Sequence, residues 1–318
     1  MPLSNTILLI IGLVTLIIGG DLLVRGASRI ALRFKISPLV VGVTIVAFGT
    51  SAPELLISIQ AALTGSPDIT MGNVIGSNIC NLALVLGVTS LIAPIPVNKD
   101  SIKIDWPMTM GSSLLLYFVV REGFVDDYEG VIFLVILVLY VVYIIRRSRK
   151  NNINIESLGV EVESAPPASK SGMAKDLGLI ALGGAGLYFG SDWFVNSAKD
   201  LAMYLGVSER IVGITVVALG TSLPELVTSI VAAFKKETDL ALGNLMGSNI
   251  FNILSILGIT SLIEEIQVSS VILNSDMIWM LLITLVLFPF MAINKKVDRY
   301  EGLILLAVYL YYTLNVIM

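Results

Sequence analysis

The sequence of 318 residues contains no histidine, a single cysteine (Cys80) and only 14% charged residues. One cysteine cannot form a disulfide within the chain. The absence of histidine excludes the usual Cys/His zinc sites and a serine–histidine–aspartate catalytic set. The sequence also has no basic nucleic-acid patch and no phosphate-binding glycine loop. We therefore expect neither an enzyme nor a bound cofactor.

Hydrophobic residues make up 56% of the chain, and the mean hydropathy is +0.90. A soluble domain has about 45–50% apolar and about 25% charged residues, so this composition indicates an integral membrane protein. Several apolar runs are long enough to cross a hydrocarbon core of about 30 Å. The sequence predicts an all-α fold with ten transmembrane helices, at 4–24, 37–63, 70–93, 104–120, 129–146, 177–195, 208–233, 240–263, 274–293 and 302–318.

The chain contains an internal repeat. Residues 213–263 match residues 42–92 at a constant offset of 171, and 28 of the 51 positions are identical. Each half holds five predicted spans, and because five is odd the second half must enter the membrane in the opposite sense. We predict two five-helix inverted-topology repeats, residues 1–146 and 176–318. The linker between them, 147–175, is polar and rich in Ser and Pro, as is typical of a flexible tether.

Positive charges orient the predicted spans. If the loops are assigned alternately to the two sides, the side of the linker collects 17 of the 20 Lys and Arg residues. The positive-inside rule then places the linker in the cytoplasm and both termini outside the cell.

Two related stretches interrupt the apolar spans: "AFGTSAPELL" at 47–56 and "ALGTSLPELV" at 218–227. Pro53 cannot donate a backbone hydrogen bond, and its ring clashes with the carbonyl of Gly49. Pro224 and Gly220 repeat the arrangement. We expect each helix to kink or break there and to free carbonyl oxygens, which are tolerated in a membrane only inside protein or beside a wet cavity. A cation is a natural partner for such oxygens.

A glutamate follows each proline, Glu54 in the first half and Glu225 in the second. A charged side chain at mid-membrane costs about 2.5–3.5 kcal/mol, so a functional role is the default hypothesis. On a helix, Thr50 shares the face of Glu54 with Ser51 beside it, and Thr221 and Ser222 repeat the pattern. Carboxylate, hydroxyl and carbonyl oxygens suit calcium or sodium better than zinc or copper.

A second pair of motifs is "GNVIGSNICN" at 72–81 and "GNLMGSNIFN" at 243–252. Ser77 and Asn81 are four residues apart, as are Ser248 and Asn252, so each helix carries a polar stripe. Taken singly, the glycines suit helix packing, the polar side chains suit interhelical hydrogen bonds, and the prolines suit simple kinks. Their joint recurrence at one offset favours function. Cys80 corresponds to a phenylalanine in the second half, which indicates packing.

At these motifs the chain resembles the calcium/cation antiporter superfamily, especially prokaryotic Na+/Ca2+ exchangers. The resemblance implies a central calcium site built by the glutamates and by oxygens near the threonines: Glu54, Glu225, Thr50 and Thr221. It implies flanking sodium sites that use the Ala47 and Ala218 carbonyls with Ser51, Ser77, Ser222 and Ser248. Asn81 and Asn252 would complete the middle of the site.

The resemblance implies a secondary active antiporter that exchanges Ca2+ for Na+ across the cell membrane by alternating access. A Ca2+/H+ antiporter remains open, and without histidine its proton carriers would be the two glutamates; a cation channel is a further alternative. Several family members have Asp where this chain has Asn252, which argues here against potassium dependence. We expect Ca2+ and Na+ as partners, with H+ as the alternative counter-ion, together with the lipid bilayer, and we expect the chain to function as a monomer without nucleic acid.

Overall fold

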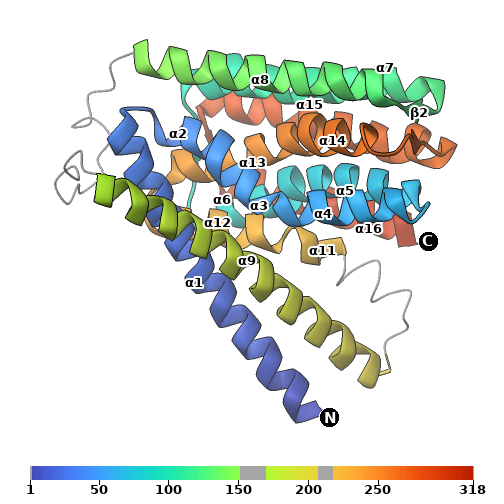
Figure 1. The fold of residues 1–318 in the computed structure, drawn as a ribbon, viewed down its shortest axis with the longest axis horizontal. Coiled ribbons are helices and arrows are strands. Elements are labelled where there is room, and N and C mark those ends of the chain that lie inside the picture. Colours follow the sequence, from blue (N-terminus) through green and yellow to red (C-terminus); the bar gives the residue numbers. More distant parts are fainter. Residues whose placement is uncertain (1, 151–169, 207–217, 318) are drawn as a thin grey trace.

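The computed structural model describes residues 2–150, 170–206 and 218–317, and these are almost entirely helical (Figure 1). In the first half, several consecutive short helices continue one another as single spans. The elements there are α1 (Pro2–Phe34), α2 (Pro38–Val41), η1 (Gly42–Val46), α3 (Ala47–Thr50), α4 (Ala52–Leu63), α5 (Pro67–Ile79), η2 (Cys80–Val85), α6 (Leu86–Ile92), η3 (Ser101–Asp105), α7 (Trp106–Val119), η4 (Val120–Glu122) and α8 (Asp127–Lys150).

The second half repeats this order. Its elements are α9 (Lys170–Tyr204), α11 (Ala218–Thr221), α12 (Leu223–Phe234), α13 (Thr238–Phe251), η7 (Asn252–Leu257), α14 (Gly258–Ser261), η8 (Ile272–Asp276), α15 (Met277–Asn294) and α16 (Arg299–Ile317). Four two-residue strands complete the described chain: β1 (Ile95–Pro96), β2 (Phe124–Val125), β3 (Ile266–Gln267) and β4 (Lys296–Val297).

Each of the ten predicted spans coincides with described helix. Within the described ranges, five helices are long and apolar enough to cross a membrane unbroken, and a helix pair bent by 45° gives a sixth span. The predicted span 208–233 is described only from Ala218, because residues 208–217 lie outside the described part of the chain. The first and sixth spans are longer than predicted. The α8 and α9 helices also extend into the predicted linker, of which residues 151–169 lie outside the described part.

The two halves are joined by short antiparallel ribbons. The β1 strand pairs with β4, and β2 pairs with β3, so each ribbon contains one strand from each half. A capping box follows the ribbon strand in both halves: the backbone N–H of Asp126 donates to Glu129 (3.1 Å), and that of Asp298 donates to Glu301 (2.8 Å). These boxes start α8 and α16 in the same way.

The fifth helix of each half packs on the third span of the other half. A Cβ at Gly130 of α8 would lie 2.9 Å from the Gly258 carbonyl oxygen of α14. A Cβ at Gly302 of α16 would likewise lie 2.9 Å from the Gly87 carbonyl oxygen of α6. Only glycine permits approaches this close. The interlocked helices make one bundle of the two halves.

The α1 and α9 helices lie side by side and leave the main bundle at an angle (Figure 1). Glycines line their crossing: a Cβ at Gly12 would meet the Gly190 carbonyl oxygen at 2.9 Å. A buried ion pair joins the same helices, because Arg33 Nη2 lies 2.6 Å from Asp176 Oδ2 and the two side chains are 7% and 3% exposed. The pair fixes the relative position of α1 and α9.

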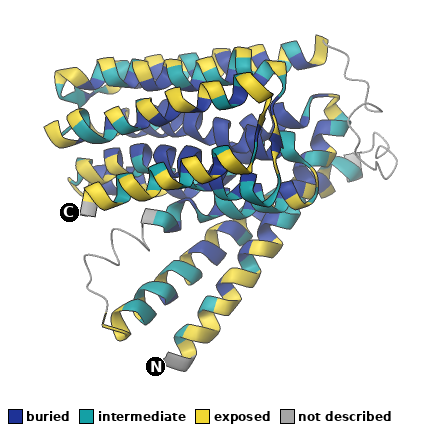
Figure 2. Ribbon diagram, turned by 180° about the vertical axis from the view of Figure 1, so that it is seen from behind, coloured by how far each residue is buried: buried dark blue, intermediate teal, exposed yellow. Residues whose placement is uncertain are grey.

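Exposed residues lie on the outside of the bundle and buried residues line its interior (Figure 2), and many large apolar residues are among the exposed ones. Leu139 on α8 is 64% exposed and Phe118 on α7 is 60% exposed, as expected for surfaces that face lipid. In contrast, every residue from Leu240 to Phe251 of α13 is buried. The centre of the bundle therefore lies at α13, and the polar stripe of this helix is enclosed by protein.

Candidate cation-binding site

Both helices that carry the proline motif are broken at its serine. Ser51 separates α3 from α4 with φ −85° and ψ 4°, and Ser222 separates α11 from α12 with φ −88° and ψ 4°. Pro53 and Pro224 fall in the first turn of the helix that follows, where a missing N–H does not cost a hydrogen bond. The predicted helix break is therefore confirmed in both halves.

The two glutamates occupy equivalent places beside these breaks. Glu54 lies in the first turn of α4 and Glu225 in the first turn of α12, and both are 0% exposed. A helix N-terminus carries a partial positive charge that stabilises a carboxylate. Ser51, three residues before Glu54 in the chain, donates to Glu225 Oε1, so the two acids belong to one buried region, where like charges repel each other. A cation between them would relieve that repulsion.

Side chains from both halves hold Glu225. Ser51 Oγ and Ser248 Oγ each donate to Glu225 Oε1 at 3.2 Å. Thr50 Oγ1 lies 3.4 Å from Ser248 Oγ. Four of the predicted ligands therefore lie together, two from each repeat.

Three of the four glutamate oxygens have no hydrogen-bond partner within the described part of the chain: Glu54 Oε1, Glu54 Oε2 and Glu225 Oε2. Buried polar atoms are nearly always hydrogen-bonded, and a buried carboxylate without a partner is costly. Binding a hard cation would satisfy these three oxygens at once. The donor chemistry therefore fits a calcium or sodium ion.

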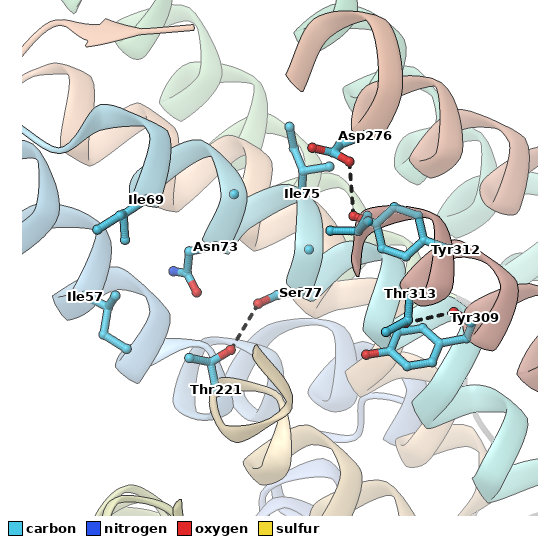
Figure 3. A pocket seen from close by; sticks show the side chains of 13 residues that line it. Ile57, Ile69, Asn73, Ile75, Ser77, Thr221, Asp276, Tyr309, Tyr312 and Thr313 are labelled. Carbon is cyan, nitrogen blue, oxygen red and sulfur yellow. Dashed lines mark hydrogen bonds between the residues drawn. The ribbon is translucent and has the colours of Figure 1, made fainter. Parts of the chain in front are cut away.

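Ser77 and Thr221 form a second contact between the halves, with 3.5 Å between their hydroxyl oxygens (Figure 3). Both line a cavity of about 420 Å³, together with Asn73, Asp276 and Tyr312. These two predicted ligands therefore lie at the wall of a cavity, whereas Thr50 and Ser248 are fully buried.

The two predicted asparagines lie at the centre of the bundle, and both are 0% exposed. Asn252 Nδ2 donates to Asn78 Oδ1 at 3.1 Å. Neither amide atom of Asn81 has a hydrogen-bond partner among the described residues, and the same holds for Asn252 Oδ1. The two asparagines thus hold neutral amide atoms without a hydrogen-bond partner among the described residues in the buried interior of the bundle.

Of the remaining predicted ligands, Ser222 lies at a break, and Ala47 and Ala218 begin the short helices before the two breaks. The Ala47 carbonyl oxygen accepts from Ser51 N at 2.9 Å and lies 3.2 Å from Thr50 Oγ1. Ser222 Oγ is buried and has no partner among the described residues. Ala218 is the first residue of α11, and its side chain lies outside the described part.

The ligand prediction missed two asparagines that contact the site. Asn244 Oδ1 accepts from Thr50 Oγ1 at 3.1 Å, and Asn73 Nδ2 donates to the Glu54 carbonyl oxygen at 3.1 Å. A sequence signal existed for both: each lies four residues before the serine of its motif, on the same helix face.

The prediction also missed a repeated pair of acids away from the centre. Tyr140 donates to the buried Asp105 at 2.9 Å, and Tyr312 donates to Asp276 at 3.2 Å. The two aspartates are 171 residues apart, which is the offset between the repeats. The sequence signal that could have identified them was therefore an acid at the same place in two equivalent spans. Asp105 lines a cavity of about 400 Å³.

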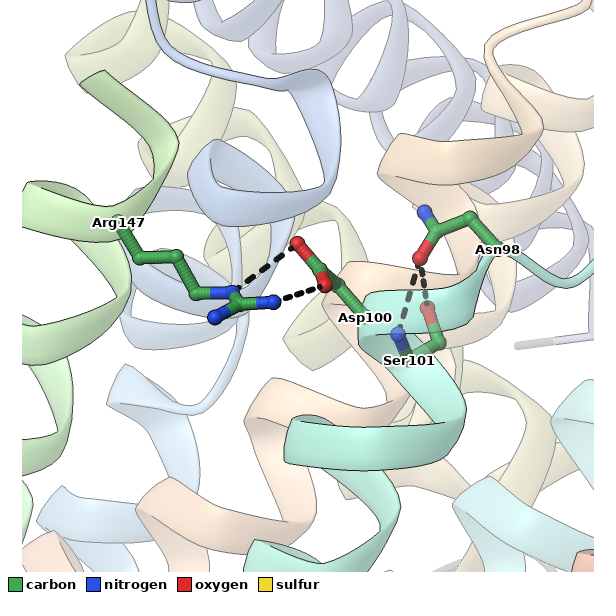
Figure 4. A network of polar contacts seen from close by, with 4 residues as sticks. All are labelled: Asn98, Asp100, Ser101 and Arg147. Carbon is green, nitrogen blue, oxygen red and sulfur yellow. Dashed lines mark hydrogen bonds and ion pairs between the residues drawn. The ribbon is translucent and has the colours of Figure 1, made fainter. Parts of the chain in front are cut away.

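An ion pair borders the Asp105 cavity. Arg147 Nη2 lies 2.9 Å from Asp100 Oδ1 (Figure 4). Asn98 Oδ1 accepts from the backbone N–H of Ser101 at 2.9 Å beside it. Both contacts hold the start of η3 in place. None of the predicted ligands is among the described residues that line this cavity.

Apolar helices that can cross a membrane, together with two buried acids at broken helices, are features of a multi-pass membrane transporter. The sequence pattern of the family described as sodium/calcium exchanger protein matches residues 4–146 and 175–318. The chain belongs to this family. The predicted family resemblance is therefore confirmed.

Individual relatives agree with this assignment. The chain is 32% identical to the sodium/calcium exchanger MaX1 of Methanosarcina acetivorans, with 96% of each chain covered. It is 34% identical to the inner membrane protein YrbG of Escherichia coli, with 89% of this chain and 87% of that protein covered.

The fold is similar to that of a solved exchanger. A structure of the sodium-calcium exchanger NCX_Mj, soaked with zero Na+ and Ca2+, matches with a TM-score of 0.84 and 32% sequence identity. The match covers 99% of this chain and 100% of that one. The predicted all-α fold of ten transmembrane helices in two inverted repeats is confirmed.

Proposed function

We propose that the chain exchanges Ca2+ for Na+ across the cell membrane, with the cations bound between Glu54 and Glu225. The observation that carries the proposal is the burial of these two carboxylates, one from each repeat, with three oxygens that lack a hydrogen-bond partner among the described residues. Two carboxylates balance the charge of one Ca2+, or they can be shared by several Na+ ions. The two substrates therefore compete for the site and cross at different times.

The ligands divide by chemistry. The calcium site uses both carboxylates with the oxygens of Thr50 and Thr221, and the middle of the site includes Asn81 and Asn252. The flanking sodium sites use neutral oxygens, because a monovalent cation needs less balancing charge. These are the carbonyls of Ala47 and Ala218 and the hydroxyls of Ser51, Ser77, Ser222 and Ser248.

Inverted repeats give such a site two pseudo-symmetric arrangements, one open to each side of the membrane. The repeats are residues 1–146 and 176–318, and the linker 147–175 joins them in the cytoplasm, with both termini outside. The MaX1 and NCX_Mj proteins are named sodium/calcium exchangers, which supports sodium as the counter-ion here. The functional unit is a monomer, because both halves of the site come from one chain.

A Ca2+/H+ antiporter is the second candidate. It is favoured by the asparagines at both Asn81 and Asn252, because they leave only Glu54 and Glu225 in the centre. Protons would then have to travel on these two acids.

Transport by purified protein in liposomes separates the two candidates. We expect an outward-directed sodium gradient to drive uptake of labelled Ca2+ at constant pH. Uptake driven by a pH gradient in the absence of sodium would favour protons instead. The Glu54→Gln variant serves as the inactive control.

A further inference from the structure

Two asparagines outside the predicted ligand set occupy the same place in the two repeats. Asn73 on α5 lies four residues before Ser77, and Asn244 on α13 lies four residues before Ser248. We propose that Asn244 is a positioning residue that sets the balance between Na+ and Ca2+ binding, because it draws the hydroxyl proton of Thr50 away from the Ala47 carbonyl. The inference rests on the exchange function proposed above.

Contacts in the two repeats orient these side chains. Asn73 Nδ2 donates to the Glu54 carbonyl oxygen (3.1 Å) and to Ser58 Oγ (3.0 Å). A carbonyl oxygen only accepts, so the amide nitrogen of Asn73 must face α4. Asn244 Nδ2 faces Ser229 Oγ in the same way at 3.4 Å, and Ser229 is the repeat equivalent of Ser58. This orientation turns Asn244 Oδ1 toward Thr50.

The Thr50 hydroxyl has one proton to give and three acceptors within reach, of which Ser248 Oγ, at 3.4 Å, is the most distant. Its Oγ1 lies 3.1 Å from Asn244 Oδ1 and 3.2 Å from the Ala47 carbonyl oxygen. The Ala47 carbonyl already accepts the helix bond from Ser51 N, which leaves it one further lone pair. When Asn244 accepts the proton, that lone pair is available to a cation, and so are the lone pairs of Thr50.

Loss of the Asn244 side chain would leave Ala47 as the nearer acceptor for this proton. The carbonyl would then be occupied at the place where a sodium ligand is required. Calcium binding depends chiefly on the charges of Glu54 and Glu225, so the loss of the Asn244 side chain should weaken calcium binding less than sodium binding. The net free energy of one hydrogen bond corresponds to a change of about two- to tenfold in a dissociation constant.

The test is equilibrium binding by the purified full chain in detergent, measured as Ca2+ titration and as displacement of bound Ca2+ by Na+. In Asn244→Ala we expect the Na+ concentration for half displacement to rise about two- to tenfold relative to the Ca2+ dissociation constant. Thr50→Val removes the proton donor, so adding Asn244→Ala in that background should not move the ratio further. A ratio that is unchanged in Asn244→Ala, or a shift that persists without the Thr50 hydroxyl, contradicts the inference.

Two further variants separate positioning from general damage. Asn244→Asp keeps the acceptor oxygen, so Na+ binding measured without Ca2+ should be no weaker than in the wild type, whereas the added charge should tighten Ca2+ binding; weaker Na+ binding would overturn the inference. Asn249→Ala removes another buried asparagine of α13, whose amide donates to Leu245 O of its own helix at 2.9 Å, and should leave the ratio unchanged.

The outcome also distinguishes this inference from the proposed function. If wild-type protein fails to bind Ca2+, or if Glu54→Gln binds it normally, the proposed site is wrong. If both behave as proposed and Asn244→Ala shifts Na+ and Ca2+ equally, only the role of Asn244 is wrong.

Discussion

Ser51 of the first repeat donates a 3.2 Å hydrogen bond to Glu225 of the second repeat. Its repeat equivalent, Ser222, is buried but has no hydrogen-bond partner in the described chain. Two positions that are identical in sequence thus have different contacts. The two repeats therefore share the order of their helices, but equivalent side chains make different contacts around the site.

This asymmetry predicts unequal effects on stability. Ser51→Ala should lower the free energy of unfolding by about 1.5–3 kcal/mol, the value of a hydrogen bond to a charged group. Ser222→Ala removes a hydroxyl without a described partner and should change stability by less than about 0.5 kcal/mol. Unfolding of both variants in cation-free detergent tests this. Equal losses would mean that the Ser51 contact does not stabilise the protein.

The Arg33–Asp176 pair predicts a second effect on stability. Arg33→Met leaves Asp176 as a buried charge without its ion-pair partner and should destabilise the protein by about 3–5 kcal/mol. Adding Asp176→Leu removes that charge and should restore most of the loss. Arg147→Met breaks the half-exposed pair with Asp100 and should cost at most about 1 kcal/mol. A double variant no more stable than Arg33→Met would contradict the prediction.

Orientation in the membrane can be tested at two repeat-equivalent loop positions. Lys99 and Ser270 are both exposed and are 171 residues apart. With inverted repeats and a cytoplasmic linker, Ser270→Cys should react with an impermeant thiol reagent in intact cells, and Lys99→Cys should not. The background variant Cys80→Ala removes the native thiol. Labelling of both positions would contradict the inverted topology, and labelling of Lys99→Cys alone would reverse the orientation.

The identity of residue 252 predicts a change in ion choice. Asn252 donates to Asn78 Oδ1 at 3.1 Å, and Asn252→Asp exchanges this amide for a third fully buried acid, in addition to the two glutamates. We expect calcium binding to survive and the dependence of transport on pH or on monovalent cations to change. An unaltered dependence on Na+, K+ and pH would show that this position does not tune selectivity.

The sequence predicts the parts of this site that are local. Pro53 and Glu54 leave strong signals in an apolar span, and their recurrence in the second half indicates that both belong to one site. Contacts between the two halves cannot be predicted in this way, because they depend on how distant helices pack. The bond from Thr50 to Asn244 joins residues 194 positions apart and depends on how α3 packs against α13, which neither motif encodes alone. The Asp105–Tyr140 pair could have been inferred in part, since an acid in a membrane span is itself unusual.

The most direct test is the calcium affinity of Glu54→Gln and Glu225→Gln, measured by equilibrium titration of purified protein. Each change keeps the shape of the side chain but removes one of two buried charges. The loss of such a contact costs about 2–5 kcal/mol, which is roughly a thirtyfold to several-thousandfold weakening. Because the proposed site is shared, we expect similar losses in the two single variants, no proportionally larger loss in the double variant, and no sodium-driven calcium flux. Near wild-type affinity and exchange in either single variant would contradict a central site between the two glutamates.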